Sequence, residues 1–175
     1  MKKKIVVLGP ESTGKSTLCE LLAKHFNCRW VPEYAREYLL ANGMEYSYED
    51  LLTIARGQLH LEDTITAQSD ANLVVIDTDM HVMKVWCEFV FEKTHPFILE
   101  QLKFRQYDLF LLCNVDLPWV KDELREYPEL ETRQSLYTIY HDMLEKENLP
   151  WVDISGNYEE RLKKAIDAVS ALMEQ

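Results

Sequence analysis

The chain of 175 residues has the length of one compact domain, and its 47% hydrophobic and 28% charged residues are typical of a globular protein with a full core. The 30 aspartates and glutamates outnumber the 19 lysines and arginines, so a formal charge of −11 argues against a nucleic-acid or membrane partner. A phosphate site in such a chain must be locally basic or built from backbone amides. We therefore expect a single domain over residues 1–175 that takes a small-molecule substrate.

The cysteines and the N-terminus indicate a cytoplasmic location. The four cysteines form no CxxC pair and lie in apolar stretches, where free cysteine behaves as a small hydrophobe. The four apolar residues before Gly9 are too few for the core of a signal peptide, and no apolar run approaches the ~18 residues of a membrane span. The oligomeric state is left open, and a homo-oligomer is compatible with the sequence.

Short apolar runs alternate along the chain with amphipathic patterns. Strands are expected at residues 5–8, 28–31, 73–76, 109–113 and 151–154. Apolar residues at helical spacing, three and four positions apart, occur at 18–22, 51–59, 136–144 and 162–172. Alternating strands and helices indicate βαβ crossovers, so we predict an α/β fold, a three-layer P-loop kinase-like domain with a mostly parallel five-stranded sheet.

The first strand leads directly into a phosphate-binding motif. Residues 9–16, GPESTGKS, fit the pattern GxxxxGK[ST] without a mismatch, between a strand and a helix. Glycines at both ends of the loop let backbone N–H groups surround a phosphate, and the following helix directs its positive end at the same anion. The sequence therefore predicts a P-loop that binds ATP. The expected nucleotide contacts are Gly9, Glu11, Ser12, Thr13, Gly14, Lys15, Ser16 and Thr17.

The apolar run at 73–76 is followed by the acidic residue Asp77. Such a carboxylate beside a P-loop holds Mg²⁺ together with the P-loop hydroxyl, so Ser16 and Asp77 are the expected metal ligands. Lys15 is the expected catalytic residue that stabilises the transferred phosphoryl group. Thr78 cannot activate water as the glutamate of an ATPase motor does, and Met80 stands where a GTPase switch needs glycine. A phosphotransferase that acts on a small acceptor remains.

The most irregular segment, residues 114–133, contains two prolines and many charged residues. It is either a solvated surface excursion, as charged runs usually are, or a mobile helical lid. We expect the lid, in which Arg125 and Arg133 close over ATP and neutralise charge on the phosphoryl group, as an arginine finger in cis does. Arg125 is the expected catalytic residue of this segment.

Four runs, in order along the chain, carry a family resemblance: GPESTGKSTL at 9–18, PEYAREYL at 32–39, IDTD at 76–79 and LPWVKDELR at 117–125. Together they resemble the ribosylnicotinamide kinase domain of the bacterial NAD-salvage regulator family. The resemblance implies an ATP-dependent kinase, on a P-loop kinase fold, that converts nicotinamide riboside to nicotinamide mononucleotide. It implies the kinase step only, because the chain has no HxGH-type nucleotidyltransferase signature.

The second of these runs supplies the expected acceptor site, at the sheet edge where parallel-sheet domains bind ligands. Glu33 is expected to accept the proton of an attacking 5′-hydroxyl, and Arg36, one turn later, to hold a ribose hydroxyl or a phosphate. Asp79 is expected to bind the ribose diol or to replace Glu33 as the base. The candidates for stacking on a cationic pyridinium ring are Trp30, Tyr34 and Trp86.

These observations predict a small-molecule kinase that transfers the γ-phosphoryl group of ATP, with Mg²⁺, to nicotinamide riboside in NAD salvage. Two alternatives stay open: a kinase of another nucleoside or metabolite, and an ATP-binding regulatory protein with little turnover. A substrate panel separates the two kinases, and release of ADP that depends on an acceptor separates both from the regulatory protein.

Overall fold

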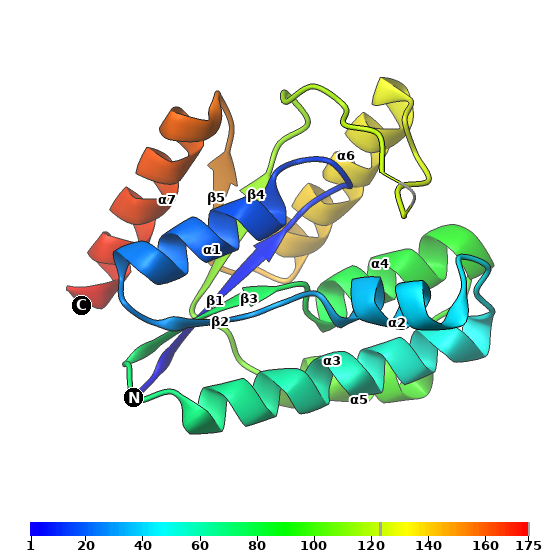
Figure 1. The fold of residues 1–175 in the computed structure, drawn as a ribbon, viewed down its shortest axis with the longest axis horizontal. Coiled ribbons are helices and arrows are strands. Elements are labelled where there is room, and N and C mark those ends of the chain that lie inside the picture. Colours follow the sequence, from blue (N-terminus) through cyan, green and yellow to red (C-terminus); the bar gives the residue numbers. More distant parts are fainter. Residues whose placement is uncertain (123, 175) are drawn as a thin grey trace.

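Five parallel strands form the centre of the molecule (Figure 1). The computed structural model describes residues 1–122 and 124–174. The strands are β1 (Lys3–Leu8), β2 (Arg29–Val31), β3 (Leu73–Asp77), β4 (Leu109–Cys113) and β5 (Trp151–Ile154), in the sheet order β2-β3-β1-β4-β5. Every pairing of neighbouring strands is parallel, which confirms the strand positions and the sheet type expected from the sequence.

Helices cover both faces of this sheet. In the described residues they are α1 (Lys15–His25), α2 (Tyr34–Asn42), α3 (Tyr48–Gln68), α4 (Met80–Phe91), α5 (Pro96–Phe104), α6 (Leu130–Lys146) and α7 (Tyr158–Met173), and none of them is long and apolar enough to cross a membrane. Alternate residues of β1 face opposite layers: Ile5 and Val7 pack with α1 and α7, whereas Val6 and Leu8 pack with α4 and α6. This is the predicted three-layer α/β architecture.

Helices α2, α4 and α5 are missing from the helical spacings found in the sequence. Half of α4 is fully buried, because it lies between the sheet and a third apolar cluster formed with α2, α3 and α5. Most positions of α4 are apolar, and a nearly continuous apolar run is harder to recognise as a helix than a regular alternation of apolar and polar residues. Helix α5 has nine residues and starts with Pro96, so it is too short for a periodic pattern to stand out.

The segment between β4 and α6, here called the lid, differs from the helical lid that we expected. Its described residues, 114–122 and 124–129, form no helix, and α6 begins at Leu130. Pro118 and Pro128 lack an amide hydrogen and disfavour the helical conformation in the residue before each of them. Arg125 therefore lies in the irregular lid, whereas Arg133 lies in the first turns of α6.

Gly57 in α3 lets α2 approach closely, and this contact gives a test of the fold. The Tyr34 Cε1 atom lies 2.0 Å from the position that a Cβ on Gly57 would occupy. We predict that Gly57→Ala lowers the free energy of unfolding by about 1–3 kcal/mol, measured by urea unfolding, because the added methyl group overpacks the contact. A decrease in the free energy of unfolding would be informative, because alanine in a helix is otherwise favoured over glycine by about 1 kcal/mol.

The same substitution in a Tyr34→Ala variant is the control for this prediction. In a Tyr34→Ala variant the overlap is gone, so Gly57→Ala should be neutral or stabilising there. An equal destabilisation in both backgrounds would contradict the steric account.

Candidate active site

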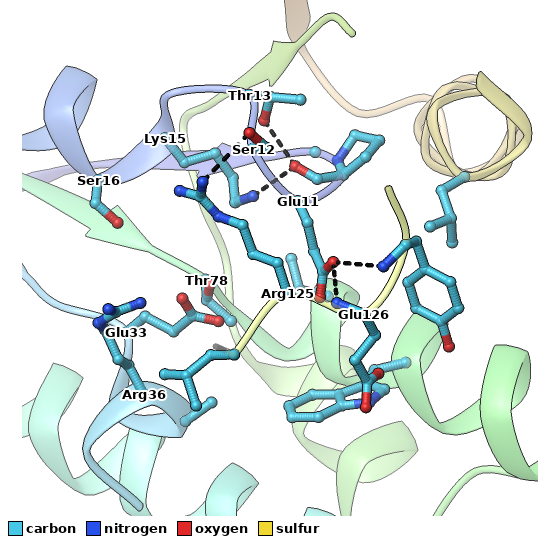
Figure 2. Close-up of a pocket in the computed structure, with 18 of the residues that line it drawn as sticks. Glu11, Ser12, Thr13, Lys15, Ser16, Glu33, Arg36, Thr78, Arg125 and Glu126 are labelled. Carbon is cyan, nitrogen blue, oxygen red and sulfur yellow. Dashed lines mark hydrogen bonds between the residues drawn. The ribbon is translucent and has the colours of Figure 1, made fainter. Parts of the chain in front are cut away.

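A cavity of about 430 Å³ lies at the carboxyl ends of β1, β2 and β3. Residues 9–17 of the P-loop and of α1 line one end, and side chains of α2, α4 and the lid line the rest. Most of the nucleotide-binding residues expected from the sequence therefore share one cavity with Glu33, Arg36 and Arg125 (Figure 2). This arrangement brings a phosphate-binding loop and an acidic residue into one cavity.

The backbone of the P-loop is compact. Gly9 has φ 141°, and a Cβ at this position would lie 2.7 Å from the carbonyl oxygen of Cys113, so the close approach to β4 requires glycine. Gly14 adopts the left-handed conformation at the N-cap of α1. The Pro10 carbonyl accepts hydrogen bonds from the Thr13 hydroxyl and from Lys15 Nζ, both at 2.7 Å. Lys15 is thereby held along the loop, with its ammonium group at the cavity.

Arg161 on α7 supports the P-loop from behind. Its guanidinium donates to the carbonyl oxygens of Thr13, Asn114 and Gly156, each at 2.8 Å, and forms an ion pair with Asp116. Sequence reasoning missed this residue. The available signal was a charged residue on a buried stripe, because Arg161 shares one face of α7 with Ala165 and Val169.

Ser16 and Asp77, the expected metal ligands, are in direct contact. Ser16 Oγ donates to Asp77 Oδ2 at 2.5 Å, and Asp77 is fully buried. Burial raises the pKa of the Asp77 carboxyl, while the Lys15 ammonium and the Ser16 hydrogen bond oppose this effect. Hydroxyl and carboxylate oxygens are hard ligands that suit Mg²⁺. The described residues contain no group of three acidic, histidine or cysteine ligands.

Glu33 occupies the N-cap position of α2, directly after β2, and its carboxylate makes no capping hydrogen bond. Figure 2 shows this carboxylate pointing into the cavity beside Thr78. Burial, and then the neighbouring Asp77 carboxylate, raises the pKa of Glu33 to about 7. A carboxyl group with such a pKa exchanges protons readily near neutral pH, as a general base must.

Gln58, a second residue that sequence reasoning missed, fixes the backbone around Glu33. Its buried amide accepts from the Tyr34 N–H at 2.7 Å and donates to the carbonyl oxygens of Pro32 at 3.2 Å and Asp77 at 3.4 Å. Gln58 therefore ties the end of β2 to the end of β3. Its polar side chain at a buried position of α3 was the available signal.

Asp79 lies elsewhere than expected for a residue that binds the acceptor. Its carboxylate is fully buried and caps α4, where it accepts from the N–H groups of His81 and Val82. It also contacts His81 Nδ1 at 2.5 Å. The lining residue of this turn is Thr78 instead, so in this structure Asp79 is committed to its own helix terminus rather than to the cavity.

The aromatic residues near Glu33 are also placed differently. Trp30 packs against the apolar layer of α1 and α7, and the Tyr34 ring packs against α3 over Gly57. Trp86 of α4 is the stacking candidate that lines the cavity. The positions of these aromatic residues in the sequence could not distinguish core packing from ligand contact, because an aromatic residue next to a strand can pack in the core or against a ligand.

Two side chains of the P-loop hold the lid. Ser12 Oγ accepts from the Val120 N–H at 2.9 Å and from Arg125 Nη1 at 3.3 Å. Glu11 Oε2 accepts from the N–H groups of Glu126 at 2.8 Å and of Tyr127 at 3.2 Å (Figure 2). Both residues line the cavity and their expected contacts with the nucleotide stay a prediction, while in this structure their side chains fasten the lid over the loop.

The lid is also tied to the acceptor side. Arg36 on α2 forms a two-pronged contact with Asp122, at 3.3 Å from Nη1 to Oδ1 and 3.0 Å from Nη2 to Oδ2. The Arg36 hydrogen bond lowers the pKa of the Asp122 carboxyl. Arg36 thus joins α2 to the lid and also lines the cavity. The sequence analysis predicted a contact of Arg36 with the ribose or a phosphate and did not predict this link to the lid.

Arg125 and Arg133 both lie near the Trp119 ring, at 6.0 Å and 5.3 Å from guanidinium carbon to ring centre. Arg125 lines the cavity, whereas Arg133 is 4% exposed and is not among the residues that line it. Within the described residues, Nε and Nη1 of Arg133 have no hydrogen-bond partner. Leaving a buried guanidinium unpaired is costly, so these atoms favour an anionic ligand close by.

Comparison with known proteins places these features in a family. A model described as an AAA domain matches residues 4–161. The trifunctional NAD biosynthesis/regulator protein NadR of Salmonella typhimurium (strain LT2) is 31% identical over 175 residues, and the NadR protein of Escherichia coli (strain K12) is 32% identical. Each match covers 97% of this chain and 42% of the relative, so the chain spans about two fifths of the length of these relatives.

Solved structures give the same picture of the fold. NadR protein in complex with NR matches with a TM-score of 0.82 and 26% identity, over 99% of this chain and 52% of that chain. A complex of NadR protein with NAD and AMP-PNP has the same score and identity, over 50% of that chain. Thymidylate kinase from Ehrlichia chaffeensis shares the fold alone, with a TM-score of 0.64, 14% identity, and coverage of 96% and 98%. Because the family match takes in the P-loop, Asp77, the lid and Arg161, the chain belongs to the P-loop family that the AAA domain model describes.

Proposed function

We propose that this protein is an ATP-dependent kinase that phosphorylates the 5′-hydroxyl of nicotinamide riboside and so forms nicotinamide mononucleotide. The observation that carries the proposal is the shared cavity, in which the Lys15 ammonium and the Glu33 carboxylate face the same space. The four sequence motifs support it, as do the NAD biosynthesis function named for the relatives and the NR bound in a similar structure. NR is taken here as nicotinamide riboside.

Each residue of the site has a role in this proposal. Lys15 and the P-loop amides hold the phosphates of ATP, and Lys15 stabilises the charge that develops on the transferred phosphoryl group. Glu33 orients the 5′-hydroxyl and accepts its proton as the oxygen attacks the γ-phosphorus in line with the leaving ADP oxygen. Arg125, with Arg133 near the same Trp119 ring, adds positive charge when the lid is closed. Ser16 and Asp77 would hold Mg²⁺, which neutralises phosphate charge when bound.

We propose a cytoplasmic location, which the four free cysteines, three of them buried, support.

An ATP-binding regulatory protein with little turnover is the second candidate function, because the relatives are named as regulators as well as biosynthetic proteins. The two candidates differ in whether an acceptor stimulates the formation of ADP.

A panel of acceptors tests the named substrate. We expect nicotinamide riboside to stimulate ADP formation well above the basal rate, with a higher kcat/KM than uridine, cytidine or thymidine, measured by an assay coupled to ADP. The expected difference has its physical source in the apolar and aromatic lining opposite the P-loop, which a neutral pyrimidine fills less favourably. A higher kcat/KM for a canonical nucleoside would remove the named substrate, and no stimulation by any acceptor would favour the regulatory protein.

Glu33→Gln tests the proposed base. The change keeps the shape of the side chain but removes its proton affinity, so kcat should fall by about 10²- to 10⁴-fold with little change in ATP affinity. For the wild type, kcat/KM should decrease as the pH falls below the pKa of Glu33, about 7, and the variant should lack this limb. Asp79→Asn is the matched control, because it alters a carboxylate outside the cavity. A larger loss of kcat in Asp79→Asn would transfer the role of base to Asp79.

The raised pKa of Glu33 also has a readout that needs no turnover. The folded-state pKa of Glu33 lies above its ordinary value, so folding stability falls as the pH rises through the interval up to about 7. Without ligands, Glu33→Gln should therefore raise the melting temperature above that of the wild type at about pH 8, and much less at about pH 5. A melting temperature that is equally affected at both values would contradict the raised pKa.

A further inference from the structure

The end of the cavity opposite the P-loop is aromatic and carries one lid carboxylate. The rings of Tyr46 and Trp86 meet edge to face, with centroids 5.0 Å apart. The Tyr46 hydroxyl accepts a hydrogen bond from Trp86 Nε1 at 2.9 Å and donates one to Glu126 Oε2 at 2.8 Å. In Figure 2 the Glu126 side chain extends from the lid into this end of the cavity. The hydrogen bonds thus fix a negative charge beside an aromatic pair.

Glu126 touches both halves of the site. Its side chain reaches Tyr46, while its backbone N–H donates to Glu11 of the P-loop at 2.8 Å. The carboxylate therefore takes its position beside the aromatic pair only while the lid lies on the P-loop. Binding of nucleotide under the lid and recognition at the aromatic end should be coupled through this residue.

The positively charged side chains of the cavity lie away from the aromatic pair of Tyr46 and Trp86. Figure 2 shows the Arg125 guanidinium turned toward Ser12 and Lys15, at the P-loop end. The Arg36 guanidinium is engaged by the Asp122 carboxylate. A ring bound against the Tyr46 and Trp86 pair, on the side of Glu126, therefore meets an aromatic surface and a carboxylate. A positively charged ring is stabilised by both, whereas a neutral ring is stabilised by the aromatic surface alone.

We propose that Glu126 is a specificity-determining residue that selects an acceptor with a positively charged aromatic base, and that it does so only when the lid is closed on the P-loop. This inference rests on the proposed function, since the pyridinium ring of nicotinamide riboside carries such a charge. It adds the residue and the physical basis of the choice between a cationic and a neutral acceptor. Arg36 and Asp122 already tie the lid to the acceptor side, so the Glu126 carboxylate is not needed for that purpose alone.

The first test compares two acceptors that differ in ring charge. Nicotinamide riboside is cationic, and 1,4-dihydronicotinamide riboside carries the same ribose and carboxamide on a neutral ring. In Glu126→Gln, which keeps a hydrogen-bond acceptor for Tyr46, the ratio of kcat/KM for the cationic over the neutral acceptor should fall by about 3- to 10-fold, mainly through KM. Glu129→Gln is the matched control, since it removes the same charge from an exposed position at the start of α6 and should leave the ratio unchanged. An unchanged ratio in Glu126→Gln, or an equal fall in both variants, would overturn the proposal.

The second test needs no turnover and separates this inference from the proposed function. Binding of 1-methylnicotinamide, a cation without a hydroxyl acceptor, is compared with that of neutral nicotinamide by the quenching of tryptophan fluorescence, with and without AMP-PNP. The wild type should bind the cation more tightly, AMP-PNP should increase this preference, and Glu126→Gln should lose the increase. Equal binding of both compounds by the wild type would overturn the inference. If no riboside is phosphorylated while the preference is present, the proposed function fails and the selectivity of Glu126 stands.

Discussion

The parallel pairing of β1 with β3 brings the P-loop and Asp77 to one edge of the sheet, and the rest of the site is arranged around them. In this register Val7 pairs with Asp77, so the P-loop and the proposed metal ligand leave the sheet at the same edge. Strand β2 pairs with β3 on its other side, and Glu33 therefore follows β2 at that edge too. Gln58 ties the ends of β2 and β3 together with buried hydrogen bonds. Nucleotide, metal and acceptor groups that are distant in sequence thus meet because strands of one direction end side by side.

The lid is the second organising element, and polar contacts join it to the P-loop, to α2 and to Tyr46. Glu11 and Ser12 hold it on the P-loop, and Asp122 and Glu126 tie it to α2 and to Tyr46. The ion pair of Arg36 with Asp122 is exposed on the Arg36 side, and exposed ion pairs contribute at most about 1 kcal/mol each. In a strongly acidic chain this arrangement has an electrostatic use as well, because the lid holds the Arg125 guanidinium against the P-loop, where we propose that an anionic nucleotide binds.

Much of the fold was predictable, because buried parallel strands are continuous apolar runs and the P-loop has a strict spacing. The positions of Lys15 and Ser16 followed from that spacing, and the end of an apolar strand indicated Asp77. Arg161 and Gln58 could not be found in the same way, since their partners lie far away in sequence and only the packed structure brings them together. The sequence also gave no basis for distinguishing a carboxylate that caps a helix from one that faces a ligand, and for that reason Asp79 was placed in the acceptor site.

The central claim is that the P-loop and Glu33 act on one reaction across one cavity, and the stoichiometry of that reaction tests it most directly. Phosphorus NMR of a mixture with ATP, Mg²⁺ and nicotinamide riboside follows ADP, inorganic phosphate and nicotinamide mononucleotide together. The account predicts one mononucleotide, phosphorylated at the 5′ position, for each ADP, with both products lost in Lys15→Ala. ADP that accumulates with inorganic phosphate in place of the mononucleotide would contradict it.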